Sequence, residues 1–358
     1  MEPLDLPKKS VKAAILVDTN QPLVIGQINL PSVLEYGQVL VKIQFSGVCG
    51  SQLGEIAGVK GPDKYLPHLL GHEASGITQL CGPGVSLVKP GDHVVMHWRK
   101  GKGIQAPTPQ YQWDGIKVNG GWVTTFNEYA VVSENRLTPI SKNFDLETAA
   151  LYGCAITTGF GAVFNDAKLH IGESIAVIGA GGTGLSVILG AKLSSAFPII
   201  AIDKYQHKLD KAKEFGATHI INSTEEDIQE RINTICEDNL PESGLDVVVD
   251  TTGIRSLREL AYELSNAQGR TILIGVPAIH HEKISIESLP LHFGKSITGS
   301  EGGNVNPSYD IPRLMQLQKN DYFNPRNMIS HSYKLDGIND AIEDMKSGKV
   351  VRCSIDMT

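Results

Sequence analysis

The stretch Ser174-Ile-Ala-Val-Ile-Gly-Ala-Gly-Gly-Thr-Gly184 decides the fold, because an apolar run leads directly into glycines spaced as G-x-G-x-x-G. The apolar run predicts a buried β-strand, and the residues after it predict a helix over Thr183–Ser195. Another apolar run, Ile199–Ile202, ends at Asp203, which lies 19 residues beyond Gly184. A glycine loop between a strand and a helix, followed at this distance by an acidic residue, indicates a βαβ unit that binds a dinucleotide.

The glycines of this loop have separate physical tasks. Gly179 permits the tight turn, Gly181 lets the backbone approach a pyrophosphate, and Gly184 lets the helix pack against the sheet. Gly182 and Thr183 open the helix, whose free N–H groups and dipole favour phosphate anions. A glycine-rich turn in an α/β domain without a ligand is the alternative.

The acidic residue indicates which dinucleotide is bound. The Asp203 carboxylate can accept hydrogen bonds from ribose hydroxyls and repels a 2′-phosphate, so we expect NAD(H) rather than NADP(H). Lys204 and Lys208 follow and are expected on the adenosine side of the cofactor.

The rest of the chain divides into a β-rich part and an alternating part. After the glycine loop, the amphipathic stretch Tyr205–Phe215 and the apolar runs Leu245–Val249 and Thr271–Gly275 continue a strand–helix alternation. This alternation predicts βαβ units and a parallel sheet. The first ~150 residues instead contain short β-branched runs, such as Val39–Phe45 and Tyr129–Val132, separated by Gly and Pro, which predict an irregular antiparallel domain.

Composition limits the class of protein. The chain has 358 residues, 41% hydrophobic, with a net charge of −7, so about two packed domains are expected. No basic cluster favours nucleic acid, and no apolar run approaches the ~20 residues of a membrane helix. Residues 1–12 lack the features of a signal peptide, which favours the cytoplasm. The five widely spaced cysteines indicate free thiols, some of them candidate metal ligands, rather than a disulfide framework.

Three residues stand out as candidate metal ligands. They are Cys49 in Gly47-Val-Cys-Gly-Ser51, His72 in Gly71-His-Glu-Ala-Ser-Gly76, and Cys154. Two thiolates and one imidazole leave one position of a tetrahedral zinc open, as in catalytic sites. Spacing alone also allows packed core cysteines and a surface histidine.

Taken together, these motifs carry a resemblance to a known family. The two segments around Cys49 and His72, the segment Gly91-Asp-His-Val94 and the glycine loop resemble the zinc-containing medium-chain alcohol dehydrogenases over nearly the whole chain. Cys154, which precedes Thr-Thr-Gly159, resembles the branch whose third zinc ligand is a cysteine.

The resemblance implies an α/β architecture in which a Rossmann doubly wound parallel sheet is inserted in a β-rich, GroES-like catalytic domain. Residues 1–155 would form the catalytic domain, 156–299 the NAD-binding domain, and 300–358 the return to the catalytic domain. The family places the nicotinamide beside the zinc between the domains. It also associates through sheet edges, here Thr271–Ser300, so a homodimer is expected.

The resemblance assigns roles to the metal-site residues. Cys49, His72 and Cys154 would be zinc ligands, and Glu73 would lie behind the metal and coordinate it transiently. The hydroxyl of Ser51 would pass the alcohol proton away.

Further roles concern the cofactor and the reaction. Ile274 and Val276 would touch the nicotinamide, and Arg352 would meet the pyrophosphate. The chain would then be a zinc-dependent oxidoreductase that moves a hydride between an alcohol or carbonyl and NAD(H). A zinc-free quinone or enoyl reductase of the same superfamily, or a catalytically silent nucleotide-binding protein, are the alternatives.

The sequence departs from the family at three places. The segment 96–119, where many members hold a structural zinc with four cysteines, contains no cysteine, so we expect one catalytic zinc and no structural zinc. Gln52 stands where an acidic residue often orients the metal-bound imidazole. Gly54 stands where some members end the proton relay in a histidine, for which His97 is a remote substitute.

A few aromatic and basic residues bear on the substrate. Trp98 and Phe126 fall where the family places pocket walls, although both are equally well explained as core aromatics. Arg99, Lys100 and Lys102 would attract an anionic alcohol or carbonyl substrate if they ring the entrance; a solvated basic loop is the alternative.

Overall fold

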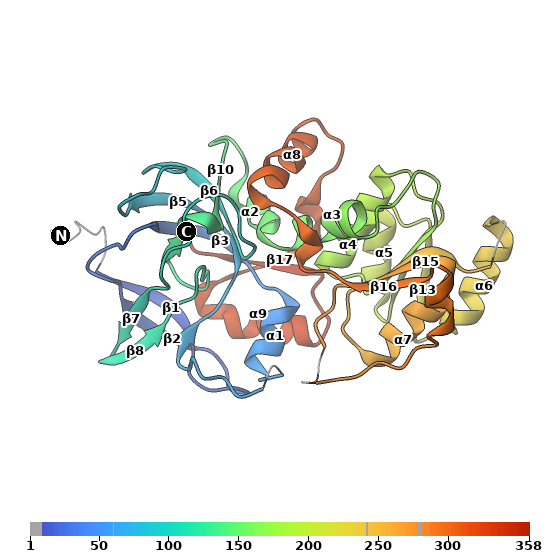
Figure 1. The fold of residues 1–358 in the computed structure, drawn as a ribbon. Coiled ribbons are helices and arrows are strands. Elements are labelled where there is room, and N and C mark those ends of the chain that lie inside the picture. The colour runs from blue at the N-terminus through green and yellow to red at the C-terminus, as the bar shows by residue number, and fades with distance from the viewer. Residues whose placement is uncertain (1–8, 60, 241–242, 278, 280) are drawn as a thin grey trace. The chain divides into compact units, whose positions relative to one another are not determined.

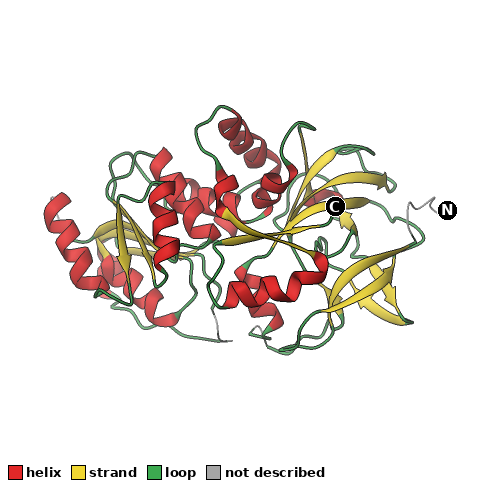
Figure 2. Cartoon of the chain, turned by 180° about the vertical axis from the view of Figure 1, so that it is seen from behind, coloured by secondary structure: helices red, strands yellow, loops and turns green. Residues whose placement is uncertain are grey.

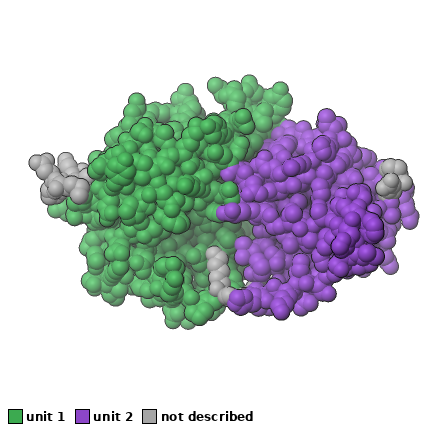
Figure 3. All heavy atoms as spheres, viewed as in Figure 1, with its two compact units in different colours: residues 1–154, 306–358 green, residues 155–305 purple. Residues whose placement is uncertain are grey.

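A computed structural model of the chain describes all residues except 1–8, 60, 241–242, 278 and 280. The chain forms two compact units, residues 1–154 with 306–358 and residues 155–305 (Figure 3). The second unit is thus inserted in the first. The boundaries expected from the sequence were 155/156 and 299/300, so the chain returns to the first unit slightly later than expected.

The second unit is built on a parallel sheet with the strand order β13-β12-β11-β14-β15-β16. From β11 the chain proceeds to one edge of the sheet and then to the other, so the strand order reverses beside β11. This doubly wound order confirms the predicted fold class. The strands are β11 (Ile175–Ile178), β12 (Ile199–Asp203), β13 (His219–Asn222), β14 (Leu245–Asp250), β15 (Ser265–Leu273) and β16 (Ser296–Gly299).

Helices flank this sheet, as Figure 2 shows for the helix-rich part of the chain. Figure 1 shows α4 and α7 on opposite sides of the strands. Ile235 of α6 and Ala261 of α7 share an apolar cluster with Ile178, Ile202 and Val248 of the sheet. The helical segments are α3 (Ala155–Gly161), the π-helical turn η3 (Ala162–Asp166), α4 (Gly182–Leu193), α5 (Gln206–Phe215), α6 (Ile228–Asn239), α7 (Arg255–Leu264), η4 (Leu289–Phe293) and η5 (Gly302–Asn304).

The first unit is mostly antiparallel. Strands β1-β2-β7-β8-β4 close into a barrel, and a second sheet has the order β10-β6-β5-β3-β18-β17, with β9 also paired to β3. The strands are β1 (Ser10–Leu16), β2 (Val24–Asn29), β3 (Gln38–Gly47), β4 (His68–Leu69), β5 (Glu73–Cys81), β6 (His93–His97), β7 (Gln110–Trp113), β8 (Ile116–Asn119), β9 (Tyr129–Ser133), β10 (Leu137–Ile140), β17 (Ile329–Lys334) and β18 (Arg352–Asp356).

The C-terminal segment completes this unit, because β18 pairs with β3 and brings β17 with it. Leu16 and Phe126 share one core cluster with Ile342 of α9 and Ile355 of β18, so chain ends far apart in sequence bury each other's apolar surface. The helical segments are α1 (Gly50–Ile56), η1 (Glu134–Arg136), α2 (Leu146–Ala150), η2 (Leu151–Gly153), α8 (Pro307–Lys319), η6 (Pro325–Met328), η7 (Leu335–Gly337) and α9 (Ile338–Lys346). Among the described helices, none is long and apolar enough to cross a bilayer.

Candidate functional site

The first unit brings three potential metal ligands together from three separate elements. Cys49 follows β3 and immediately precedes α1, His72 immediately precedes β5, and Cys154 follows the turn η2. One ligand atom from each lies within 4.8 Å of the others, and the two sulfur atoms are 4.0 Å apart. Because β3 and β5 are paired strands, the ends that carry Cys49 and His72 are adjacent.

Close packing brings the third ligand to this edge. A Cβ atom on Gly153 would lie 2.3 Å from the carbonyl oxygen of Met96 and 2.8 Å from the Cα of Glu73. Only glycine therefore lets the turn before Cys154 press against β5 and β6.

The electrostatics of the cluster favour thiolate. The hydrogen bond between Cys49 and Cys154 and the interactions with His72 lower the pKa of Cys49 well below that of an ordinary thiol, although burial raises it. Thiolate is the form that binds metal. The donor set, two sulfurs and an imidazole at mutual contact distance, fits zinc with one position left open.

Gln52 links two of the ligands. Its Oε1 accepts a hydrogen bond from the backbone N–H of Cys49 at 2.7 Å, and its Nε2 lies 3.2 Å from Nδ1 of His72. The side chain is almost completely buried. Gln52 thus occupies the position expected from the sequence, with a neutral amide where a carboxylate would carry a charge.

Glu73 does not join the converging ligand atoms of the described residues. Its carboxylate is fully buried and forms an ion pair with Arg352, which is itself buried. The sequence reasoning treated Glu73 as a ligand and Arg352 as a cofactor contact, and it missed that the two pair with each other. β5 and β18 flank β3, so Glu73 and Arg352 lie on either side of its end, where Gly47 has no side chain to separate them. No local pattern signals this pairing.

The two residues considered for the proton relay, Ser51 and His97, have different surroundings. Ser51 lies half-buried in the first turn of α1, two residues after Cys49. His97 is a poor relay, because Nδ1 faces the Arg99 carbonyl at 2.8 Å and Nε2 faces the Thr138 hydroxyl at 2.9 Å. Burial lowers the pKa of His97 to about 4, so the ring stays neutral near pH 7.

Phe126 and Trp98, the two aromatic residues expected to wall a pocket, differ in their burial. Phe126 is fully buried in the core of the first unit, which supports its role as a core aromatic. Trp98 is half-buried at the end of β6, with the Arg99 guanidinium 5.8 Å from its ring centroid. The Lys102 ammonium lies 4.0 Å from the Tyr309 ring, while Lys100 is exposed.

A buried carboxylate organises the cysteine-free segment 96–119. Glu134 is 1% exposed, and its Oε1 accepts hydrogen bonds from the N–H groups of Ser86 (2.7 Å) and Leu87 (2.9 Å). Its Oε2 accepts another from Ile104 at 2.8 Å. Sequence reasoning missed Glu134, because nothing in the pattern distinguishes it from a surface glutamate.

The second unit presents the glycine loop at the carboxyl end of β11. Gly179 has a φ of 96°, and a Cβ on Gly184 would lie 1.9 Å from the Gly179 carbonyl oxygen. A Cβ on Gly181 would meet no atom within 4 Å, so this backbone is open to an approaching ligand. Gly182 and Thr183 begin α4 as expected, with the free N–H groups that favour phosphate.

Asp203 ends β12, as expected. Its Oδ2 accepts a hydrogen bond from the Ala180 N–H at 2.8 Å, and its Oδ1 accepts one from Tyr205 N–H at 3.0 Å. The same carboxylate therefore supports the glycine loop. Lys204 and Lys208 place their ammonium groups 5.0 Å and 4.8 Å from the Tyr205 ring.

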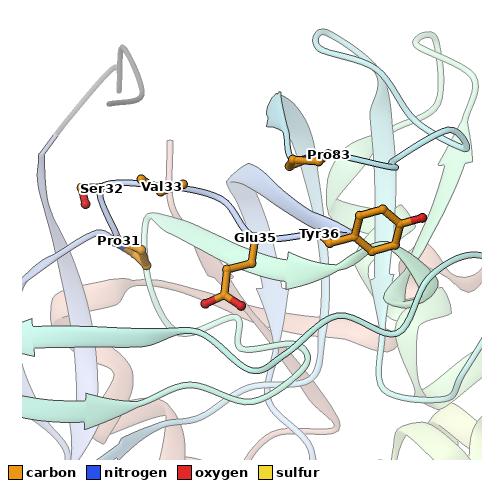
Figure 4. A pocket seen from close by; sticks show the side chains of 6 residues that line it. All are labelled: Pro31, Ser32, Val33, Glu35, Tyr36 and Pro83. Atoms are coloured by element: carbon orange, nitrogen blue, oxygen red, sulfur yellow. The ribbon is translucent and has the colours of Figure 1, made fainter. Parts of the chain in front are cut away.

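Two further surface features lie outside the ligand cluster and the glycine loop. A hollow on the first unit is lined by Pro31, Ser32, Val33, Glu35, Tyr36 and Pro83 (Figure 4). None of the expected site residues lines it. In the second unit, Ile274 and Val276 follow β15, and Val276 is 50% exposed.

Comparison with known families covers both units. The model of the alcohol dehydrogenase GroES-like domain matches residues 35–142, and the model of zinc-binding dehydrogenases matches residues 182–320. The first match includes Cys49 and His72, and the second begins in the glycine loop.

Individual proteins are similar over almost the whole chain. S-(hydroxymethyl)glutathione dehydrogenase of Haemophilus influenzae is 32% identical, covering 96% of both chains. Among solved structures, benzyl alcohol dehydrogenase from Acinetobacter calcoaceticus has a TM-score of 0.87 at 27% identity, covering 98% of this chain and 100% of the other. A zinc-binding-domain alcohol dehydrogenase protein from Burkholderia ambifaria also has a TM-score of 0.87 at 27% identity, covering 98% and 99%.

Proposed function

The chain belongs to the zinc-dependent medium-chain alcohol dehydrogenase family, and from this premise we propose the residues and the substrate class through which it works. It is an oxidoreductase that transfers a hydride between an alcohol, or the corresponding aldehyde or ketone, and a nicotinamide cofactor. The zinc-free reductase and the silent binding protein are not favoured.

The proposed zinc ligands are Cys49, His72 and Cys154, and the convergence of their three ligand atoms is the observation that carries the proposal. When bound there, zinc supplies Lewis-acid chemistry that acidifies an alcohol hydroxyl and polarises a carbonyl. Gln52 holds the imidazole and the Cys49 backbone in place. Ser51 carries the substrate proton away from the ligand cluster.

The proposed cofactor is NAD(H), held with its pyrophosphate on the glycine loop. The Asp203 carboxylate accepts hydrogen bonds from the ribose hydroxyls and repels a 2′-phosphate, which supports NAD over NADP. Ile274 and Val276 contact the nicotinamide, which supplies the hydride chemistry. Lys208 lies on the adenosine side. Arg352 is the proposed pyrophosphate contact, a role for which its buried side chain would have to leave Glu73.

We further propose that the protein holds one zinc ion and no structural zinc. Glu134 supports this, because three backbone N–H groups from two loops already converge on its carboxylate. A buried carboxylate with three such bonds ties loops together without a metal.

Elemental analysis of the purified protein tests both metal proposals. The wild type should contain about one zinc per chain, as the single catalytic site requires, and Cys154→Ala should contain almost none. Cys236→Ala is the matched control, since Cys236 is a buried thiol of α6 in the other unit. Two zinc ions per chain would refute the absence of a structural site, and a metal-free wild type would refute the catalytic site.

The proposed substrate is an alcohol that carries a negative charge. S-(hydroxymethyl)glutathione, named for the Haemophilus influenzae relative, is of this class, whereas the benzyl alcohol of the solved relative is neutral. Lys100 and Lys102 support the proposal, because both residues are exposed. Equal kcat/KM for charged and neutral alcohols, with no effect of salt, would refute it.

We propose a cytoplasmic homodimer. All five cysteines are free, as in a reducing compartment. β16 forms an edge of the described sheet, and Leu289 and Phe293 nearby are 60% and 66% exposed. The mass in solution should be twice 38.7 kDa, and Phe293→Glu should reduce it; a monomeric wild type would refute the dimer.

A further inference from the structure

Three neighbouring strands of the parallel sheet end side by side. β11 leads into the glycine loop, β14 leads into Thr251–Gly253, and β15 leads into Ile274–Val276. In doubly wound sheets, ligands bind at the carboxyl ends of the strands, where the strand order reverses. Here the order reverses beside β11, so these three loops form the edge that faces a ligand.

Asp250, the last residue of β14, ties two of the loops together. Its fully buried carboxylate accepts hydrogen bonds from Thr252 N–H (3.0 Å), the Thr252 hydroxyl (2.6 Å) and Gly253 N–H (3.1 Å). Its backbone carbonyl accepts hydrogen bonds from Ile274 N–H at 2.8 Å and Gly275 N–H at 3.1 Å. One residue therefore sets both its own loop and the start of the next.

Arg258 of α7 holds the same segment from the other side. Its guanidinium Nη2 donates a hydrogen bond to the Gly275 carbonyl, and its Nε lies 3.7 Å from Oδ2 of Asp250. Both polar backbone groups of Gly275 are thus engaged, the N–H by Asp250 and the carbonyl by Arg258. A Cβ on Gly275 would lie 2.1 Å from the Gly253 nitrogen, so the two loops meet backbone to backbone.

Thr251 extends this arrangement to the glycine loop. Its hydroxyl lies 2.9 Å from the Ile178 carbonyl oxygen and 3.1 Å from that of Gly179, and it donates to them. A continuous set of contacts therefore runs from Gly179 through Thr251 and Asp250 to Gly275.

A buried ion pair is weak support for a role in stability alone, because desolvation offsets the Coulomb attraction. The pair of Asp250 and Arg258 instead lies at the ligand-facing edge, beside the half-exposed Val276. We propose that Asp250 and Arg258 are positioning residues that align the nicotinamide-contacting segment Ile274–Val276 with the glycine loop. The inference rests on the nicotinamide contact proposed above for that segment.

The experiment compares two ligands on the zinc-loaded protein. NADH contains the nicotinamide, whereas ADP-ribose contains only the part bound by the glycine loop and Asp203. Arg258→Met should weaken NADH binding about tenfold, which is the size of one charge-assisted hydrogen bond. It should weaken ADP-ribose binding less than about twofold. Arg258→Lys keeps the positive charge beside Asp250 and should fall between wild type and Arg258→Met.

Arg255→Met is the matched control, because Arg255 is on the same helix, its side chain is 54% exposed, and it pairs with Glu259 one turn further along that helix. It should leave both affinities unchanged. Unchanged NADH affinity in Arg258→Met, or equal weakening of both ligands, would overturn the inference. If Arg258→Met fails to fold, the test is made with Arg258→Lys, in which the affinity for NADH should again fall more than the affinity for ADP-ribose. A wild type that binds NADH no more tightly than ADP-ribose would instead refute the nicotinamide contact itself, and the inference with it.

Discussion

The zinc cluster and the glycine loop are assembled in opposite ways. The loop is a continuous stretch, Gly179–Gly184, whose conformation follows mainly from its own residues, with support from Asp203 and Thr251. The cluster gathers Cys49, His72 and Cys154, which are separated by up to 105 residues and come from three elements. A local motif can be damaged by one atom inside it, whereas a dispersed site can also fail through residues that merely hold its elements in place.

Each site also depends on residues that lie outside it. The cluster depends on Gln52 and on the close packing of Gly153 against β5 and β6. The loop depends on Asp203, the last residue of β12, and on Thr251, which directly follows β14; these two strands flank β11. The two units should therefore lose metal and cofactor independently.

The largest effect is expected from Cys154→Ser. Loss of one of three zinc ligands should lower alcohol turnover by about a thousandfold or more, since metal catalysis contributes several kcal/mol. NADH binding, measured by fluorescence titration, should change little because the glycine loop belongs to the other unit. Cys236→Ser is the control and should retain both zinc and turnover. A variant that lost zinc and NADH binding together would show that the two sites are not separable.

Gly184→Ala should have the converse effect. The added Cβ would lie 1.9 Å from the Gly179 carbonyl oxygen, so α4 must shift away from the loop, and NADH affinity should fall about a hundredfold. Zinc content should stay at the wild-type value. Gly190→Ala is the matched control in the same helix, where a Cβ would lie 3.2 Å from the end of the Val163 side chain. Zinc loss in Gly184→Ala would contradict the comparison.

Gln52→Ala should speed zinc release without removing a ligand. Outer contacts to metal-bound histidines typically change metal affinity by about 10–100-fold. The measurement is the rate at which a coloured chelator captures zinc from the folded protein. Gln79→Ala, a change in a half-buried glutamine of β5, provides the baseline. A release rate equal to wild type would mean that Gln52 is not a support for the cluster.

Asp203→Ser should shift the cofactor preference. Removing the carboxylate removes its repulsion of a 2′-phosphate, so the ratio of kcat/KM for NAD to that for NADP should fall about tenfold. Because Asp203 also accepts a hydrogen bond from the Ala180 N–H, the variant should bind both cofactors more weakly, with the larger loss for NAD. An unchanged ratio would mean that Asp203 supports the loop but does not select the cofactor.

The last effect concerns the acid stability of the first unit and leaves both ligand sites unchanged. Burial lowers the pKa of His97 to about 4, so the unfolded chain binds more protons between pH 4 and the ordinary histidine value of about 6.5. Stability from this group is complete above about pH 6.5 and falls by up to ~1.4 kcal/mol per pH unit below it. Denaturant unfolding of His97→Gln should show a shallower pH dependence. His170→Gln, at an exposed site, should match the wild type.

Much of the second unit could be predicted from the sequence. The strand ending at Ile178, the helix after the glycines and the strand ending at Asp203 all lie where the pattern placed them, within one or two residues. These features depend on local periodicity and on glycine, whose backbone preferences act within a few residues. β15 begins earlier than its apolar run, at Ser265, because pairing with β14 extends it.

The sequence by itself determined the glycine loop and the α/β class, and with the family resemblance it placed Cys49, His72 and Cys154 together as zinc ligands. Only the tertiary structure decided that Glu73 pairs with Arg352, that Glu134 joins two loops, and that Arg258 holds Gly275. The physical reason is range. A turn or a helix start is encoded by neighbours along the chain. The partner of a buried charge is instead set by strand register and helix packing, which bring together residues far apart in the sequence without any local pattern that predicts the contact.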